Sequence, residues 1–329
     1  MQRSFSEYEF ASKKRLTRYD RFMAEIETMM PWSELVAAIA GHYPKGEGRG
    51  RPPIWLERML RMYIAQNCFG LSDGGIEDAL YDSQAIRRFV GIDLGRETAP
   101  DATTLLKFRR RLEGKQLTET IVTTINAHLA AKGLFLRRGT VVDATISGAP
   151  PSTKNAQGER EPDMHQAKRG NEWHFGMKPR IGVHAVSGLV HTVIGTATNV
   201  ADVPQAQDLL HGDEEHAFGD TGHQGVDKRE ENIGSPVTWH VAIRPSKRRE
   251  LAGHGWAQKL EWIEQIKANI RAKVEHPFHG VKNLFRHRKT RYRGLAKNTA
   301  QLHTLFAMAN LVPARRLILN FDPRGASAA

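Results

Sequence analysis

The chain has 329 residues, which allows two or three domains, and its 40% hydrophobic content excludes a wholly disordered protein. A single cysteine, Cys68, excludes both a disulfide framework and a cysteine-based zinc site. The sequence has neither an apolar run long enough to cross a membrane nor a signal peptide, so we expect a cytoplasmic protein with no membrane partner. The formal net charge of +12 favours a polyanionic partner.

We predict a helical domain over residues 1–135, where no strand pattern is found. Apolar spacing and end signals predict helices at residues 31–41, 54–68, 72–80, 100–115 and 116–132. The first helix is expected to begin with Pro31 and a capping Ser33, and the last to stop at Gly133.

Residues 136–329 have the pattern of a second, mixed α/β domain. β-rich runs predict strands at residues 140–146, 173–186, 189–200, 216–220 and 237–243, with a turn at Ser187-Gly188. Helices are expected at residues 201–211, 224–233, 256–286 with a break near Pro277, and 299–319. The polar residues 148–171 read as a long surface loop. This order is typical of a mixed sheet flanked by helices.

Three acids in this second domain are candidates for metal binding. Asp143 lies inside an apolar strand, Asp220 ends another strand, and Glu275 lies on a basic helix. If the two strands are neighbours, both aspartates reach one edge of the sheet, and a helix packed on the sheet can bring Glu275 beside them. Three carboxylates form an oxygen-donor site that favours Mg²⁺ or Mn²⁺. Each acid could also have a purely structural role. Asp143 could be a hydrogen-bonded strand residue, Asp220 a turn residue and Glu275 an ion-pair partner.

The positive charge is concentrated around Glu275. Residues 267–297 contain ten Lys and Arg and one acid, which gives nine of the twelve net charges. Such a run is ordinarily a solvated face, but its position beside a candidate acid favours phosphate binding. The candidate phosphate contacts, which become DNA contacts if the partner is DNA, are Arg271, Lys282, Arg286, Arg288, Lys289, Arg291 and Arg293.

The histidines and tryptophans of the second domain are expected to have structural roles rather than to bind a metal or DNA bases. Histidines lie near Glu275 (His276, His279 and His287) and beside the expected hairpin (His165, His174, His184 and His191). His276 and His279 lack a second ligand pair at zinc-site spacing, so zinc is not expected at these histidines. Trp173 and Trp256 are expected to pack rather than to stack on bases.

Several long segments resemble bacterial DDE transposases of the insertion-sequence-five (InsH-like) family. The segments are VVDATISGAPPSTKN, KRGNEWHFGMKPRIGVHAVSGLVHTV, GDTGHQGVDKRE and IRAKVEHPFHGVKNLF in the second domain. In the first domain, WLERMLRMYIAQNCFGLSDGGIEDALYDS and PDATTLLKFRRRLE resemble the family's helical domain. The likeness covers nearly the whole chain.

This resemblance implies a ribonuclease H-like catalytic domain with Asp143, Asp220 and Glu275 as its catalytic acids. They would hold two Mg²⁺ or Mn²⁺ ions at a DNA phosphodiester, with hydrolysis at the element end followed by strand transfer into target DNA. It also implies that the helical domain recognises terminal inverted repeats and that the protein is a homodimer in the DNA complex, acting at the bacterial nucleoid.

Two positions depart from the family's motifs. The tyrosine expected as the fourth residue of the Asp-x-Gly-Tyr motif is His223. The tyrosine expected three residues before Arg271 is Ala268. Arg271 and Lys282 do match the signature around Glu275. Two other functions therefore stay open: a catalytically inactive remnant that occupies terminal repeats, and a simple ribonuclease H-like nuclease without strand transfer.

Overall fold

The computed structural model describes residues 13–46, 52–134, 139–150 and 159–321. Its contacts divide the chain into two compact units, Met1–His128 with Ala307–Ala329, and Leu129–Phe306. Residues 1–12 and part of the predicted polar loop, residues 151–158, lie outside the described residues. The domain division between residues 135 and 136 stays a prediction.

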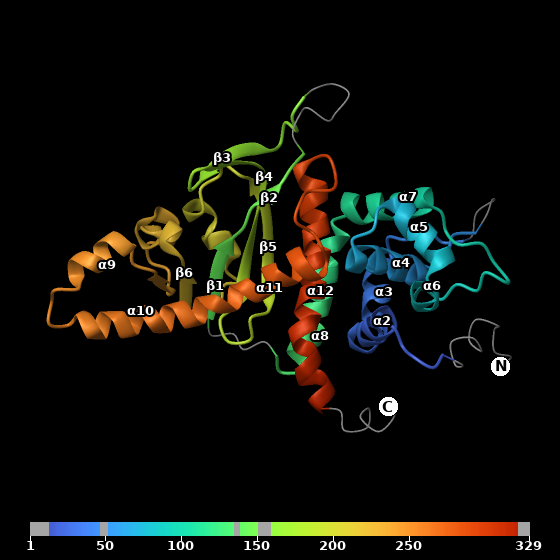
Figure 1. Ribbon diagram of the computed structural model, residues 1–329, viewed down its shortest axis with the longest axis horizontal. Helices are drawn as coiled ribbons and strands as arrows, with labels where there is room; N and C mark the ends of the chain where they lie inside the picture. Colours follow the sequence, from blue (N-terminus) through green and yellow to red (C-terminus); the bar gives the residue numbers. More distant parts are fainter. Residues whose placement is uncertain (1–12, 47–51, 135–138, 151–158, 322–329) are drawn as a thin grey trace. The chain divides into compact units, whose positions relative to one another are not determined.

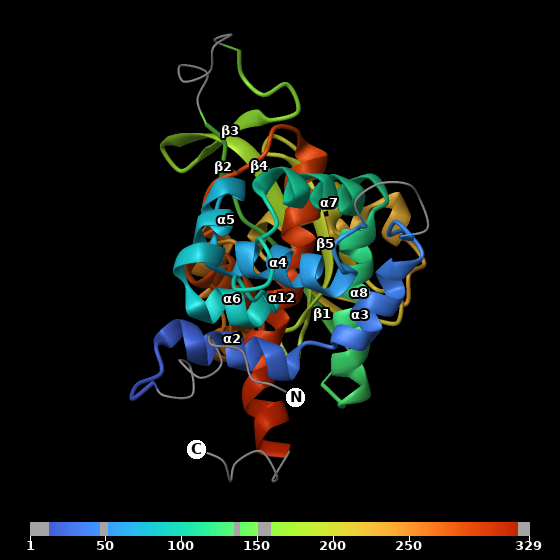
Figure 2. The ribbon, with the colours of Figure 1, turned by 90° about the vertical axis from the view of Figure 1, so that its right-hand side faces the viewer.

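The first unit is built from helices in its described part. Their bounds are α2 (Arg18–Met29), α3 (Trp32–Ala40), α4 (Leu56–Phe69), α5 (Asp73–Asp82), α6 (Gln84–Val90), α7 (Ala102–Gly114), most of α8 (Leu117–Ala131) and the end of α12 (Leu295–Phe321). Helix α4 is central and contacts α3, α5, α6 and α7 (Figure 2). Most of its residues are buried, so this helix forms the core of the unit.

Helix starts in this unit agree with the sequence except at one cap. Ser72 caps α5, with its Oγ accepting a hydrogen bond from the Gly75 amide at 2.9 Å. Ser33 does not cap α3, because the N-cap position is Pro31 and the Ser33 hydroxyl donates to Glu34 instead. Helices α2 and α6 were not predicted, although α2 begins with a capping box at Thr17 that the sequence carries.

The second unit is a seven-stranded mixed sheet with helices, drawn in Figure 1. The strands are β1 (Gly139–Ala144), β2 (Ser147–Gly148), β3 (His165–Arg169), β4 (Glu172–His184), β5 (Val190–Ala197), β6 (His216–Gly219) and β7 (Thr238–Val241). They are ordered β2-β4-β1-β6-β7, with β3 and β5 also paired to β4. Strands β1, β6 and β7 are parallel, whereas β4 is antiparallel to β1 and β5. This arrangement confirms the predicted ribonuclease H-like fold class.

Strands β4 and β5 form the predicted hairpin around Ser187 and Gly188. Gly188 has a φ of 73°, a left-handed conformation that glycine adopts without steric cost. The predicted polar loop was wrong in one part, because it contains β3, which pairs with the first half of β4. The β3 residues are mostly exposed, so they lack the hydrophobic alternation that identifies a strand in a sequence.

The helices of the second unit follow β7. Helices α9 (Pro245–Leu251) and α10 (Ala257–Arg271) precede a 3₁₀ turn at Ala272–Val274, and α11 (Glu275–His279) leads into a π turn at Gly280–Leu284. Helix α10 packs against β6, and the 3₁₀ turn packs against β1 (Figure 1). None of the helices in the described ranges is long and apolar enough to cross a membrane.

Three predicted helices differ from the structure. Residues 201–211 form 3₁₀ turns at Val203–Gln205 and Gln207–Leu209, and the backbone is extended again at Leu210, so no continuous α-helix forms. Residues 224–233 form Val226–Lys228 and Glu230–Asn232, separated by an extended Arg229. The break expected near Pro277 lies at residues 272–274 instead, since Pro277 falls in the first turn of α11, where a missing N–H is tolerated.

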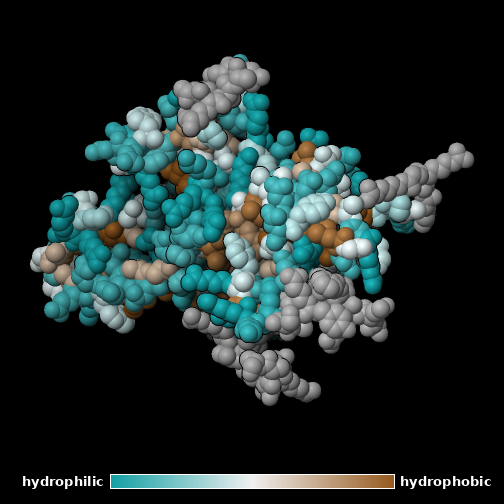
Figure 3. Space-filling model, turned by 45° about the vertical axis from the view of Figure 1, so that its right-hand side comes forward, coloured by the Kyte–Doolittle hydropathy of each residue, from teal (hydrophilic) through white to brown (hydrophobic). Residues whose placement is uncertain are grey.

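Hydrophilic residues predominate on the face drawn in Figure 3, and hydrophobic residues there form separate patches. Trp173 and Trp256 were expected to pack, but their exposed fractions are 64% and 47%. The Trp256 ring instead stacks on His254, with ring centroids 5.2 Å apart.

Candidate active site

Asp143 and Asp220 lie at the same end of two neighbouring parallel strands. In the β1–β6 pairing Val141 is opposite Phe218, and each acid follows two residues later in its own strand direction. Because side chains alternate along a strand, this equal offset places both carboxyl groups on one face at one edge of the sheet. The convergence that we predicted for the two aspartates is therefore present.

Glu275 joins the two aspartates through the segment between α10 and α11. It is the first residue of α11 and directly follows the 3₁₀ turn that packs on β1. Val274 in that turn is buried, which anchors the backbone next to Glu275. As a result Asp143, Asp220 and Glu275 all line one cleft with a volume of about 390 Å³.

The three acids form an open group rather than a tight cage. Their ligand atoms do not all lie within 4.8 Å of one another. Within the described ranges, that close spacing occurs at His191, His211 and Glu214 instead. Ligands of a single small cation lie closer together than the three acids do, because metal–oxygen distances are only about 2.0–2.6 Å.

The Asp143 carboxyl group is held in a buried and negatively charged environment. Burial, with a smaller contribution from the neighbouring Asp220 and Glu275 carboxylates, raises its pKa to about 6. A hydrogen bond from the Ala144 amide to Asp143 Oδ1, at 2.7 Å, and the charge of Arg271 act in the opposite direction. The favourable interactions with Arg271 and the Ala144 amide therefore do not offset the burial and the negative charges around the ionised Asp143.

Asp220 is stabilised in its ionised form instead. His223 Nδ1 donates to Asp220 Oδ1 at 2.7 Å, and the Gly222 amide donates to the same oxygen at 2.9 Å. The His223 hydrogen bond is the main cause that lowers the pKa of Asp220, and it outweighs burial. His223 itself is only 2% exposed, and Asp220 Oδ2 has no hydrogen-bond partner within the described ranges.

Three cationic side chains line the same cleft. Arg271 ends α10, Lys282 lies in the π turn after α11, and Arg169 ends β3. Lys282 Nζ donates to Thr145 Oγ1, and burial is the main cause that lowers the pKa of Lys282. The cleft thus combines three carboxylates with three cations, an arrangement able to hold both a metal and a phosphate group.

Comparison with known families gives two matches that together cover most of the chain. A family described as "Transposase DDE domain" matches residues 134–311, which is more than half of the chain. A family described as "Transposase domain (DUF772)" matches residues 10–111. The chain belongs to the DDE transposases. No solved structure matches it.

The other predicted DNA contacts of this transposase lie after the cleft. Arg286, Arg288, Lys289 and Arg293 are exposed in the segment that leads to α12. Arg293 forms an ion pair with Glu161 at 3.8 Å, and Arg288 donates to Asn283. Arg291 is half-buried, which lowers its pKa, so it is the predicted contact least accessible to a DNA phosphate.

The sequence analysis missed one cationic residue of the transposase cleft, Arg169, and one residue behind it, His223, that contacts Asp220. Arg169 was placed in a loop, and only its pairing with Glu172 across the β3–β4 turn brings it toward the acids. His223 was noted only as a departure from a tyrosine, whereas the structure shows it bonded to Asp220. The Asp220–His223 spacing of three residues was the available signal, since a turn brings such residues together.

A larger cleft of about 630 Å³ lies in the helical unit of the transposase, lined by parts of α2, α4 and α6. Its charged lining residues carry both signs and include Asp20, Arg21, Arg61 and Arg88. Arg61 is already paired with Glu27 and Glu57, so this cleft offers no set of catalytic groups comparable to the three acids.

Proposed function

We propose that this transposase cuts DNA at the ends of an insertion sequence and joins the freed ends to target DNA. Asp143, Asp220 and Glu275 are proposed as the catalytic acids, which hold two Mg²⁺ or Mn²⁺ ions. The observation that carries the proposal is the meeting of these three acids in one cleft with Arg271, Lys282 and Arg169. The acids come from three separate segments of a DDE transposase domain.

The chemistry of the cleft fits divalent cations. Its acids supply oxygen donors only, which Mg²⁺ and Mn²⁺ prefer over imidazole or thiolate. Asp143 is buried beside two like charges, and a bound cation offsets this unfavourable arrangement. When bound, a pair of such ions supplies charge neutralisation at the phosphate and activation of the attacking oxygen.

The residues of the chain position these groups before DNA arrives. The Ala144 amide fixes one oxygen of Asp143, and the His223–Gly222 pair fixes Oδ1 of Asp220. This leaves Oδ2 of Asp220 as the oxygen directed to a ligand. Arg271 and Arg169 supply charge-assisted hydrogen bonds to phosphate oxygens at the rim of the cleft.

The finer assignments follow from the resemblance to the insertion-sequence-five family. The helical unit would recognise the terminal inverted repeats, and a homodimer would hold two element ends at the nucleoid. Arg286, Arg288, Lys289 and Arg293 would extend the phosphate track beyond the cleft, and Arg291 would follow only if it moves outward.

The experiment uses the purified chain and a labelled fragment that carries the terminal repeat of its own element. With Mg²⁺ we expect a nick at the element end that leaves a 3′-OH, followed by joined products when target DNA is added. Cleavage without joining would indicate a simple nuclease. Repeat binding with no cleavage in Mg²⁺ or Mn²⁺ would indicate an inactive remnant and overturn the proposal.

Replacing Arg169 with alanine is expected to weaken DNA binding about three- to tenfold at moderate salt and to reduce the salt slope by about one. Arg169 is exposed and has no ion-pair partner within the described ranges, so its loss should leave the melting temperature unchanged. A fluorescence-anisotropy titration at several salt concentrations measures both quantities.

Lys168→Ala is the matched control for this prediction. Lys168 precedes Arg169 on β3 and carries the same charge, but neighbouring strand residues point to opposite faces and Lys168 does not line the cleft. Equal losses in Arg169→Ala and Lys168→Ala would mean that only net charge matters and that Arg169 makes no specific phosphate contact.

A further inference from the structure

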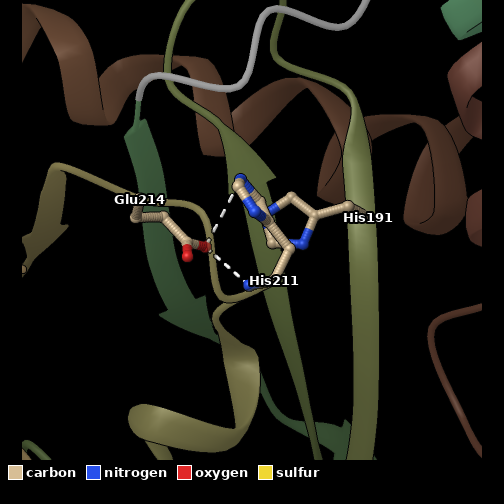
Figure 4. A group of neighbouring side chains, drawn as sticks. All are labelled: His191, His211 and Glu214. Carbon is tan, nitrogen blue, oxygen red and sulfur yellow. Dashed lines mark hydrogen bonds and ion pairs between the residues drawn. The ribbon is translucent and has the colours of Figure 1, made fainter.

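A second group of potential metal ligands lies in the catalytic unit, away from the three acids. His191 lies on β5, and His211 and Glu214 lie in the segment before β6 (Figure 4). Their ligand atoms all lie within 4.8 Å of one another. Thr140, which contacts the group, lies on β1 three residues before Asp143. At about 3.3 Å per residue the two places are roughly 10 Å apart along the strand.

Glu214 is the fixed member of this group. Its side chain is fully buried, and Oε1 accepts hydrogen bonds from the Thr140 hydroxyl at 2.8 Å and the His211 amide at 2.6 Å. Oε2 accepts a hydrogen bond from the Gly212 amide at 2.7 Å. No Lys or Arg forms an ion pair with Glu214 in the described part of the chain, so its buried charge has no permanent cation beside it.

His191 is held in place by the strand beneath it. A Cβ atom on Gly182 would lie 2.6 Å from His191 Cε1 and 2.1 Å from the Leu209 carbonyl oxygen, so this ring position requires glycine at residue 182. The Thr192 hydroxyl lies 2.9 Å from Nδ1 of His191, and the Thr140 hydroxyl lies 3.0 Å from Nε2. Because the Thr140 hydroxyl donates its hydrogen to Glu214 Oε1, Nε2–H of His191 donates to the Thr140 oxygen in the metal-free chain. A cation bound at Nε2 would take the place of that hydrogen, on the side where Glu214 lies.

His211 completes the group from the solvent side. Its Nε2 lies 3.5 Å from Glu214 Oε1, and its ring packs edge-on against that of His191 with centroids 5.0 Å apart. Figure 4 shows the two rings and the Glu214 carboxylate converging from separate segments.

We propose that His191, His211 and Glu214 bind one divalent transition-metal cation of the zinc class. Two imidazoles and one carboxylate form a ligand set that zinc takes in proteins, with a fourth position left to water on the exposed His211 side. Imidazole donors select such cations over Mg²⁺, which distinguishes this group from the three carboxylates of the cleft. The cation would join β5 to the segment that leads into β6, the strand directly before Asp220.

The test measures zinc retention by the purified full-length chain. The protein is stripped with a chelator, loaded with Zn²⁺, desalted and analysed for bound metal, and a Co²⁺ titration records the ligand-field spectrum. His211→Ala is the informative variant, because His211 is exposed and its loss should not prevent folding. His254→Ala, an exposed histidine outside the group, is the matched control, and Asp143→Asn with Glu275→Gln removes the acidic cleft.

The wild type, His254→Ala and the Asp143→Asn, Glu275→Gln variant should each retain one zinc per chain. His211→Ala should bind zinc at least about tenfold more weakly and lose the Co²⁺ spectrum. The proposal is overturned if the wild type retains no zinc, or if His211→Ala retains as much as the wild type. Loss of zinc only when the acids of the cleft are replaced would also overturn it, because the metal would then be in the cleft.

Discussion

Asp143→Asn is expected to abolish DNA cleavage while raising the melting temperature of the metal-free protein. Loss of one carboxylate ligand should reduce the cleavage rate about a thousandfold or more, since the charge stabilisation that the bound ions supply amounts to several kcal/mol. Folding should not suffer, because the asparagine Oδ1 can still accept the hydrogen bond from the Ala144 amide. Nicking assays and thermal unfolding in chelator measure the two effects.

The gain in stability follows from the direction of the pKa shift. Burial, with the repulsion of Asp220 and Glu275, raises the pKa of Asp143 from 3.8 to about 6 in the folded chain. The folded state therefore holds the proton more tightly than the unfolded state, and the unfolding free energy decreases as the pH rises from about 4 to about 6. At pH 7 the ionised Asp143 costs about 1–3 kcal/mol, which the asparagine variant avoids.

The pH dependence provides the decisive check. The excess stability of Asp143→Asn should be fully present at pH 7, shrink as the pH falls through 6, and vanish near pH 4. Asp73→Asn is the control in which the opposite change in stability is expected. Burial alone would raise the pKa of Asp73, but hydrogen bonds from Arg109 and Gln66 lower it below its usual value. Replacing this stabilised carboxylate should therefore destabilise the protein at pH 7. A lower melting temperature for Asp143→Asn at pH 7 would contradict the account of a destabilising carboxylate.

The meeting of the acids was predictable because it depends on strand order and spacing. Asp143 and Asp220 end short apolar runs, and parallel neighbours bring such ends together. The apolar runs of β1 and β4 and the turn at Gly188 carry local signals that a sequence shows directly. Glu275 was already a candidate from the sequence, but only the resemblance to known transposases separated it from an ordinary ion-pair residue of a basic helix.

The parts that escaped prediction depend on contacts between distant segments. Strand β3 is mostly exposed and exists because β4 supplies its hydrogen bonds, so no local pattern indicates it or the place of Arg169. The group of His191, His211 and Glu214 likewise depends on the close approach of β5 to the segment before β6 at Gly182. These histidines are twenty residues apart in the sequence and have no motif spacing.

The basic segment was predicted as one DNA-binding surface, but the structure divides it by burial. Arg271 and Lys282 line the cleft, whereas Arg286 and Arg288 are exposed beyond it and Arg291 is half-buried. The number of charges along a sequence does not separate cleft-lining, exposed and half-buried basic side chains. Their burial depends on how the π turn and the chain after it pack.

His223→Phe is expected to weaken Mn²⁺ binding and slow cleavage by about 10–100-fold, the range seen when a residue that orients a metal ligand is lost. This prediction rests on the proposed function. His223 is buried and donates Nδ1–H to Asp220 Oδ1, and phenylalanine fills a similar volume without a donor. Asp220 would keep only the Gly222 amide, so its carboxylate would be less well oriented. Electron paramagnetic resonance of free Mn²⁺ measures binding independently of DNA cleavage.

His223→Asn should restore much of the loss, because the asparagine side-chain nitrogen branches from Cγ as Nδ1 of histidine does and can donate to the same oxygen. His287→Phe is the matched control: His287 is equally buried, but its ring nitrogens have no hydrogen-bond partner in the described ranges, so Mn²⁺ binding should not change. Equal Mn²⁺ affinity in His223→Phe and the wild type would show that Asp220 is positioned without His223. If His223→Phe weakens Mn²⁺ binding and His223→Asn restores it, the histidine at the family's tyrosine position keeps Asp220 correctly oriented. This departure from the motif would then not by itself indicate an inactive transposase.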